Sequence, residues 1–102
     1  MNRGEVWLAE VGRKRRPVVV LTRSEVIDVR SLVTVAEIST SARGLAAEVA
    51  IDHVAAGLDR ECVVNADGLH TIAQSTLTTR VGQLDDLTLS RVCAAVEYAL
   101  GC

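Results

Sequence analysis

Aromatic residues are nearly absent from this chain of 102 residues, which has no Phe, one Trp and one Tyr. The hydrophobic core must therefore consist of Val, Leu, Ile and Ala, and the abundance of Val favours β-strands. No stretch approaches the roughly 18 apolar residues of a membrane span, and charged residues follow the N-terminal Met without the apolar run of a signal peptide. The three Cys have no CxxC spacing, which is typical of reduced thiols in a cytoplasmic protein.

Motifs for metal or cofactor chemistry are also missing from the sequence. The two His do not lie at ligand spacing with a Cys pair, which argues against a zinc site. No Walker-type loop, GxSxG elbow or HExxH motif occurs. A catalyst of this sequence would therefore work without a metal or cofactor. The length predicts one domain, residues 1–102, with a core that needs no disulfide.

Apolar periodicity predicts six or seven short strands followed by one helix. Asp85 is the expected N-cap of that helix, apolar residues recur at helical spacing up to Leu100, and Gly101 follows its end. Asp67-Gly68 is interpreted as a turn between two strands, and residues 53–57 as a single helical turn. The fold class is thus mostly β with a C-terminal α-helix, a small barrel against which the helix packs. The predicted strands are residues 5–11, 17–22, 32–38, 48–52, 61–65, 69–72 and 78–84.

Positive charge is concentrated near the N-terminus, although the net charge is −2. Residues 1–30 hold seven basic and four acidic groups, so the acidic total allows a basic face. The run Arg13-Lys14-Arg15-Arg16 follows Gly12 in the break between the first two strands. Its cations repel one another unless an anion such as phosphate is near, and a solvated turn is the alternative. Because Arg16 abuts Pro17 at the start of a strand, it is held more rigidly, which suits a catalytic role.

Few other side chains could carry chemistry. The hydroxyls of Ser39 and Thr40, at the end of a predicted strand, could face a phosphate or form a turn. His70 could act in acid–base chemistry or lie on the surface of a short strand, and Asp67 is by itself a turn residue. Arg, His and hydroxyl groups suit cleavage of RNA through its own 2′-hydroxyl. That reaction needs a base, a cation for the pentavalent phosphate and an acid for the leaving oxygen.

Five segments, in chain order, have the pattern of a known family. They are Arg3-Gly4-Glu5-Val6-Trp7-Leu8, Arg16-Pro17-Val18-Val19-Val20-Leu21-Thr22, Ala36-Glu37-Ile38-Ser39, residues 62–72 and Gly82-Gln83-Leu84-Asp85. These segments resemble the MazF/PemK toxin family. The resemblance implies a compact SH3-like barrel with a C-terminal helix that works as a homodimer. It also implies a metal-independent endoribonuclease toxin that cuts a short single-stranded RNA sequence and is neutralised by a cognate antitoxin.

The resemblance also implies roles for individual residues. Arg16 carries over as the catalytic acid or the stabiliser of phosphate charge, and Ser39 as a catalytic hydroxyl directed at the phosphate. Asp67 carries over as a residue that contacts the substrate or holds the active-site arginine. The other residues expected to contact RNA are Arg15, Thr40 and His70.

The chain departs from the family at several positions. The loop between the first two strands is short, Ser39 replaces the commoner Thr, and His70 stands where Arg or Lys is usual. Only Trp7 and Tyr98 offer stacking platforms, so base recognition would rest on hydrogen bonds and backbone contacts. Two alternatives remain open: a binding toxin that inhibits gyrase through its last residues, and a degenerate member that only sequesters antitoxin.

Overall fold

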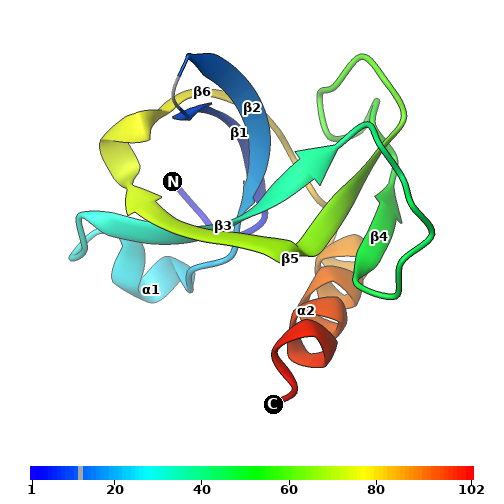
Figure 1. Cartoon of the computed structure of the whole chain (residues 1–102). Helices are drawn as coiled ribbons and strands as arrows, with labels where there is room; N and C mark the ends of the chain where they lie inside the picture. The colour runs from blue at the N-terminus through cyan, green and yellow to red at the C-terminus, as the bar shows by residue number, and fades with distance from the viewer. Residues whose placement is uncertain (12) are drawn as a thin grey trace.

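The polypeptide forms one strongly curved antiparallel sheet of six strands (Figure 1). The structure, a computed structural model, describes residues 1–11 and 13–102. The order of the strands across the sheet is β4-β5-β3-β2-β1-β6. The strands are β1 (Glu5–Val11), β2 (Lys14–Val20), β3 (Leu32–Ser39), β4 (Glu48–Ile51), β5 (Cys62–Ala73) and β6 (Leu77–Gln83). The helices are α1 (Ser24–Ile27), the 3-10 turn η1 (Gln74–Thr76) and α2 (Asp86–Leu100).

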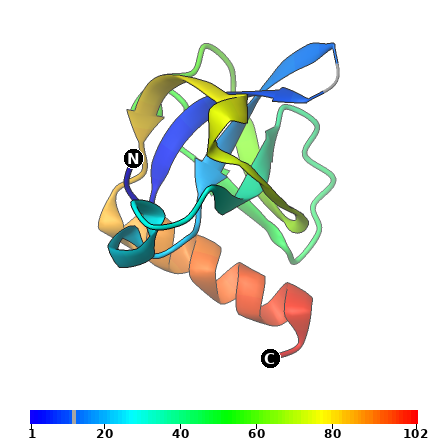
Figure 2. The same cartoon turned by 90° about the vertical axis from the view of Figure 1, so that its left-hand side faces the viewer.

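The predicted fold class, mostly β with a C-terminal helix, is confirmed. The sheet curls but does not close, because β4 and β6 are its two edges in the described part of the chain. Figure 2 shows α2 below the sheet and the β1–β2 hairpin projecting at the other end of the molecule. None of the described helices is long and apolar enough to cross a membrane.

Alternate residues of the central strands fill two hydrophobic cores on opposite faces of the sheet. The α2-side core holds Val19 of β2 together with Val92 of α2, whereas the α1-side core holds Val18 and Val20 with Ile27 of α1. Strand residues one apart point to opposite faces. The apolar run of β2 is therefore buried on both faces, as its sequence predicts.

The C-terminal helix begins and ends as predicted. The Asp85 carboxylate accepts a hydrogen bond of 2.7 Å from the backbone N–H of Thr88, which satisfies one of the free donors of the first turn. Gly101 follows the helix with φ 71°, the left-handed conformation that glycine adopts without strain. The buried residues Val92 and Ala95 hold the helix against the sheet.

The second strand begins earlier than predicted, at Lys14 and not at Pro17. Glu10 of β1 pairs with Arg15, and Ala9 pairs with Arg16, so these two arginines belong to the hairpin ladder. Pro17 lies inside the strand, at a point where pairing with β3 has not yet begun, and proline is tolerated at such an edge position. Gly12, predicted to break the two strands, lies outside the described residues.

The predicted turn at Asp67-Gly68 is wrong, because β5 runs unbroken from Cys62 to Ala73. The register on β3 shifts instead: Glu37 pairs with Asn65, but its neighbour Ala36 pairs with Leu69. Residues 66–68 therefore form a bulge in β5. A bulge admits the same residues as a turn, since both need irregular backbone.

Candidate active site

The pairing register places five polar side chains on the face of the sheet that carries the α1-side core. Residues two apart on a strand share a face, and so do directly paired residues. Val18 lies in the α1-side core and pairs with Glu37, which pairs with Asn65. Val35 of the same core pairs with His70. These five side chains are Arg16, Glu37, Ser39, Asn65 and His70, and the ion pair of Glu5 and Arg80 lies on the same face, on β1 and β6.

The catalytic candidates Arg16 and Ser39 lie on opposite sides of a gap between β2 and β3. Pairing of these strands ends at Val18 and Glu37, and the same register continued by two residues sets Arg16 opposite Ser39. The strands separate there, and a cleft of about 450 Å³ opens beside them. Its lining residues are Leu8, Arg15, Arg16, Pro17, Ile38, Thr40, Leu58, Asp59, Arg60 and Cys62.

This cleft is basic, because three arginines and one aspartate line it. Arg15 forms an exposed ion pair with Glu10, with 3.4 Å between Nε and Oε1. Such pairs are weak and exchange readily with other anions. Arg16 has no carboxylate within 4 Å among the residues that the structure describes. Its guanidinium is therefore available for a phosphate, which it can bind through two parallel hydrogen bonds.

The predicted hydroxyl residues divide between the two faces of β3. Thr40 lines the basic cleft, whereas Ser39 does not. The Ser39 Oγ accepts a hydrogen bond of 3.0 Å from the backbone N–H of Ser41, so the turn interpretation of this segment holds. Its own proton remains available for donation to an oxygen on the face shared with Arg16.

Asp67 is not brought to Arg16. It lies in the β5 bulge and lines a different cavity with Tyr98 and Ala99 of α2. Its backbone N–H donates to Oδ1 of Asn65 at 3.0 Å. Two described carboxylates lie on the face of Arg16 in strands next to β2: that of Glu37 in β3, and that of Glu5 in β1, which is nearly buried and paired with Arg80.

Glu37 and His70 form a pair on this face. The His70 Nε2 lies 3.1 Å from Oε1 of Glu37, and both side chains are partly exposed, by 49% and 37%. A Cβ at Gly68 would clash with Oε2 of Glu37, so Gly68 leaves room for the carboxylate in the position that it occupies. Glu37 was not predicted as a site residue. The signal was present: it is the one charged residue in the otherwise apolar or neutral strand 32–38.

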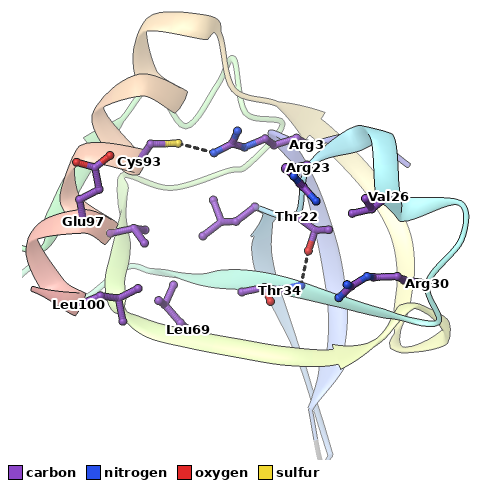
Figure 3. Close-up of a pocket in the computed structure, with 12 residues that line it drawn as sticks. Arg3, Thr22, Arg23, Val26, Arg30, Thr34, Leu69, Cys93, Glu97 and Leu100 are labelled. Atoms are coloured by element: carbon purple, nitrogen blue, oxygen red, sulfur yellow. Dashed lines mark hydrogen bonds between the residues drawn. The ribbon is translucent and has the colours of Figure 1, made fainter. Parts of the chain in front are cut away.

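A second cavity of about 450 Å³ lies between α1 and α2 and shares no residue with the basic cleft (Figure 3). Arg3, Arg23 and Arg30 line it around an apolar floor. The Arg3 guanidinium donates a hydrogen bond of 2.9 Å to the Cys93 sulfur, which the figure marks with a dashed line. None of the residues predicted to act on RNA lies in this cavity. In the described part of the chain, no three His, Cys, Asp or Glu residues converge as a metal site would require.

Comparisons with known proteins show the family of the chain. Residues 2–100 match the family model described as "PemK-like, MazF-like toxin of type II toxin-antitoxin system". The probable endoribonuclease MazF5 of Mycobacterium tuberculosis is 39% identical over 98% of this chain and 93% of its own length. The probable endoribonuclease MazF2 of the same organism is 34% identical over the full length of both chains.

One solved structure extends the likeness to three dimensions. Mycobacterium tuberculosis toxin MazF-mt6 superposes with a TM-score of 0.88 at 34% identity, over 95% of this chain and 96% of that one. The family model and the relatives each cover nearly the whole chain. The chain therefore belongs to the PemK-like, MazF-like toxin family of type II toxin–antitoxin systems.

Proposed function

We propose that this chain is the toxin of a type II toxin–antitoxin pair and cleaves single-stranded RNA, such as mRNA, at a specific short sequence without a metal ion. The relatives named as probable endoribonucleases support the reaction. The observation that carries the proposal is Arg16, an exposed arginine at a gap between strands in a basic cleft, with no carboxylate partner among the residues that the structure describes.

Residues of the cleft and of the adjoining face of the sheet supply what the reaction needs. Attack of the substrate 2′-hydroxyl on its phosphate builds negative charge on the phosphate oxygens, and a fixed guanidinium stabilises that charge. Arg16 takes this role, and Ser39 donates its hydroxyl proton to a phosphate oxygen. Arg15, Thr40 and His70 hold the neighbouring nucleotides. Because Asp67 lies apart from Arg16, it contacts RNA only where the RNA passes the bulge in β5.

The proposed partners follow from the family and the charge of the cleft. A cognate antitoxin with an acidic segment would cover the arginines and exclude RNA by occupying the same positive groups. The active form is a homodimer, and its substrate places its action in the cytoplasm. The exposed Tyr98 and Leu100 at the end of α2 are the surface that a gyrase-binding toxin would use, and no relative reported above carries that activity.

Primer-extension mapping of cuts on a long RNA in EDTA tests the proposal. The parent protein should cut at one short sequence and leave a 2′,3′-cyclic phosphate. Arg16→Ala should lower the rate at least about 100-fold, because a positioned cation contributes that much to a charged transition state. Arg91→Ala, which removes an exposed arginine from α2, is the control with the same change in net charge.

Each outcome separates the alternatives. Cleavage by Arg16→Ala at the parent rate would refute the assigned site. No cleavage of any RNA by the parent would refute the enzymatic function. In that case, RNA binding without turnover would indicate a member that sequesters antitoxin, and loss of toxicity on removal of residues 98–102 would indicate a gyrase-binding toxin.

A further inference from the structure

We propose that Glu37 is the general base that removes the 2′-hydroxyl proton of the RNA, and that His70 and Gly68 position its carboxylate. The inference rests on the proposed function, because it names the base of the same reaction. It depends on three features of the structure: the face on which Glu37 lies, its pairing with His70, and the space that Gly68 leaves for it.

The placement of Glu37 suits a base. It pairs with Val18, and Arg16 lies two residues further along β2 on the same face. With a rise of about 3.3 Å per residue and about 4.8 Å between strands, the Cα atoms of Glu37 and Arg16 lie about 8 Å apart. Ser39 lies two residues from Glu37 on β3. A phosphate held by Arg16 and Ser39 would thus present its ribose to the Glu37 carboxylate.

Neighbouring residues restrict the position of the Glu37 carboxylate. His70 Nε2 lies 3.1 Å from Oε1, which is ion-pair distance when the imidazole is protonated. Oε2 lies so close to Gly68 that a methyl group there would displace it. Both side chains of the pair are more than one-third exposed, so the ion pair adds little to stability. A carboxylate beside a phosphate site also repels the negatively charged substrate. Acceptance of the 2′-hydroxyl proton is a role that accounts for a carboxylate at this position.

The reaction balances with these groups. Oε2 of Glu37 accepts the 2′-hydroxyl proton while the bond from O2′ to phosphorus forms and the bond from phosphorus to O5′ breaks. O5′ takes a proton from water, and the products are a 2′,3′-cyclic phosphate and a 5′-hydroxyl. Arg16 and Ser39 stabilise the charge on the non-bridging oxygens. Glu37 then returns its proton to solvent.

Steady-state cleavage of an oligonucleotide that contains the mapped sequence tests the role of Glu37. Glu37→Gln keeps the shape and the acceptor for His70 but cannot take a proton. We expect kcat to fall about 100- to 10,000-fold, the usual contribution of a general base, with KM unchanged within about threefold. Glu25→Gln, an exposed carboxylate of α1, is the matched control and should match the parent.

The pH profile distinguishes a base from a structural carboxylate. The other charged or titratable groups on the same face, which are Lys14, Arg16, His70 and the Glu5–Arg80 ion pair, remain in the variant. In the parent, kcat/KM should fall tenfold per pH unit on the acid side, which is the limb that a general base produces. In Glu37→Gln that acid limb should be absent. His70→Gln should retain the limb at a lower rate, because His70 positions the base and does not replace it.

Different results would refute the role of Glu37 and the proposed function. If the parent cuts RNA and Glu37→Gln has the same kcat or the same acid limb, Glu37 is not the base and the proposed function stands. If the parent does not cut RNA, the proposed function itself falls. Should Glu37→Gln fail to fold by circular dichroism, Glu37→Asp decides: a reduced rate with the acid limb supports the assignment, and a flat profile overturns it.

Discussion

The nearly buried carboxylate of Glu5 gives the sharpest stability prediction. Its residue is 7% exposed, and it accepts hydrogen bonds from the Asn2 backbone N–H at 2.8 Å, Trp7 Nε1 at 3.1 Å and Arg80 Nε at 2.9 Å. Burial raises the pKa of Glu5, but these donors and the charge of Arg80 outweigh it and hold the pKa below its ordinary value. The ionised carboxylate therefore stabilises the fold at neutral pH.

Glu5→Gln should destabilise the protein by about 2 kcal/mol at pH 7. The amide oxygen can replace Oε1 and keep the donors Asn2 and Trp7, but its NH₂ group then faces the donating Nε of Arg80. One charge-assisted hydrogen bond is lost, worth about 1.5–3 kcal/mol, and water recovers part of it because Arg80 is half-exposed. For a domain of this size the loss corresponds to a fall in Tm of about 10 °C.

Urea unfolding at fixed protein concentration, followed by circular dichroism, measures the effect. Because the folded pKa is depressed, the stabilisation is present above the unfolded pKa and is lost as the pH falls through the folded pKa. The difference between parent and variant should thus shrink in acid. Glu10→Gln, whose exposed carboxylate pairs with Arg15, is the control and should cost under about 1 kcal/mol. An equal loss at pH 7 and pH 3, or a loss at pH 7 no larger than that of the control, would refute this reasoning.

Three further substitutions and one control, Gly44→Ala, test the fold. Gly82→Ala puts a Cβ 2.1 Å from the backbone oxygen of Ala56, which cannot move aside as a side chain can. This substitution should lower the free energy of unfolding in urea by about 3 kcal/mol. Gly44→Ala places its Cβ within 4 Å of no atom and should lower the free energy of unfolding by only about 1–2 kcal/mol, because Gly44 has a positive φ. Asp85→Ala removes the N-cap of α2 and should lower the Tm at neutral pH. Hydrogen bonding to the first turn lowers the pKa of Asp85, so the difference in Tm between parent and variant should shrink as the pH falls through the lowered pKa. Val92→Ala, at a fully buried position, should cost about 2 kcal/mol, and a loss below that of an exposed control would contradict the packing of α2 described above.

Strong local signals predicted the regular elements well. The α2 helix has an N-cap, an apolar stripe and a terminal glycine in agreement, and the structure follows each of them. The buried run of β2 needed only its β-branched composition. Helix α1, residues 24–27, escaped prediction because four residues cannot show a helical period.

Errors arose where long-range pairing overrides local preference. Asp67-Gly68 has the composition of a turn, but its flanks pair with β3 on both sides, and the chain meets that demand with a bulge. Lys14 to Arg16 looks like a loop because it is charged, yet pairing with β1 makes it a strand. Local sequence carries no information about either partner strand.

The candidate site was predictable only in part for the same reason. The resemblance identified Arg16 and Ser39, and the register sets them on one face across the gap. Glu37 and His70 come together only because the bulge shifts the register of β5 between them. The sequence does not indicate that shift, so it does not predict that Glu37 and His70 lie side by side.

The division of the interior into two cores also bears on how the molecule opens. Residues of β2 alternate between the cores, with Val19 in one and Val18 and Val20 in the other. Detachment of α2 exposes the first core alone, whereas β2 is freed only when both are lost. Amide protons of β2 should therefore exchange with deuterium through global unfolding alone. Those of α2 should exchange through a partial opening that requires less free energy. The toxin can thus loosen its C-terminal helix while the strand that carries Arg16 keeps its place.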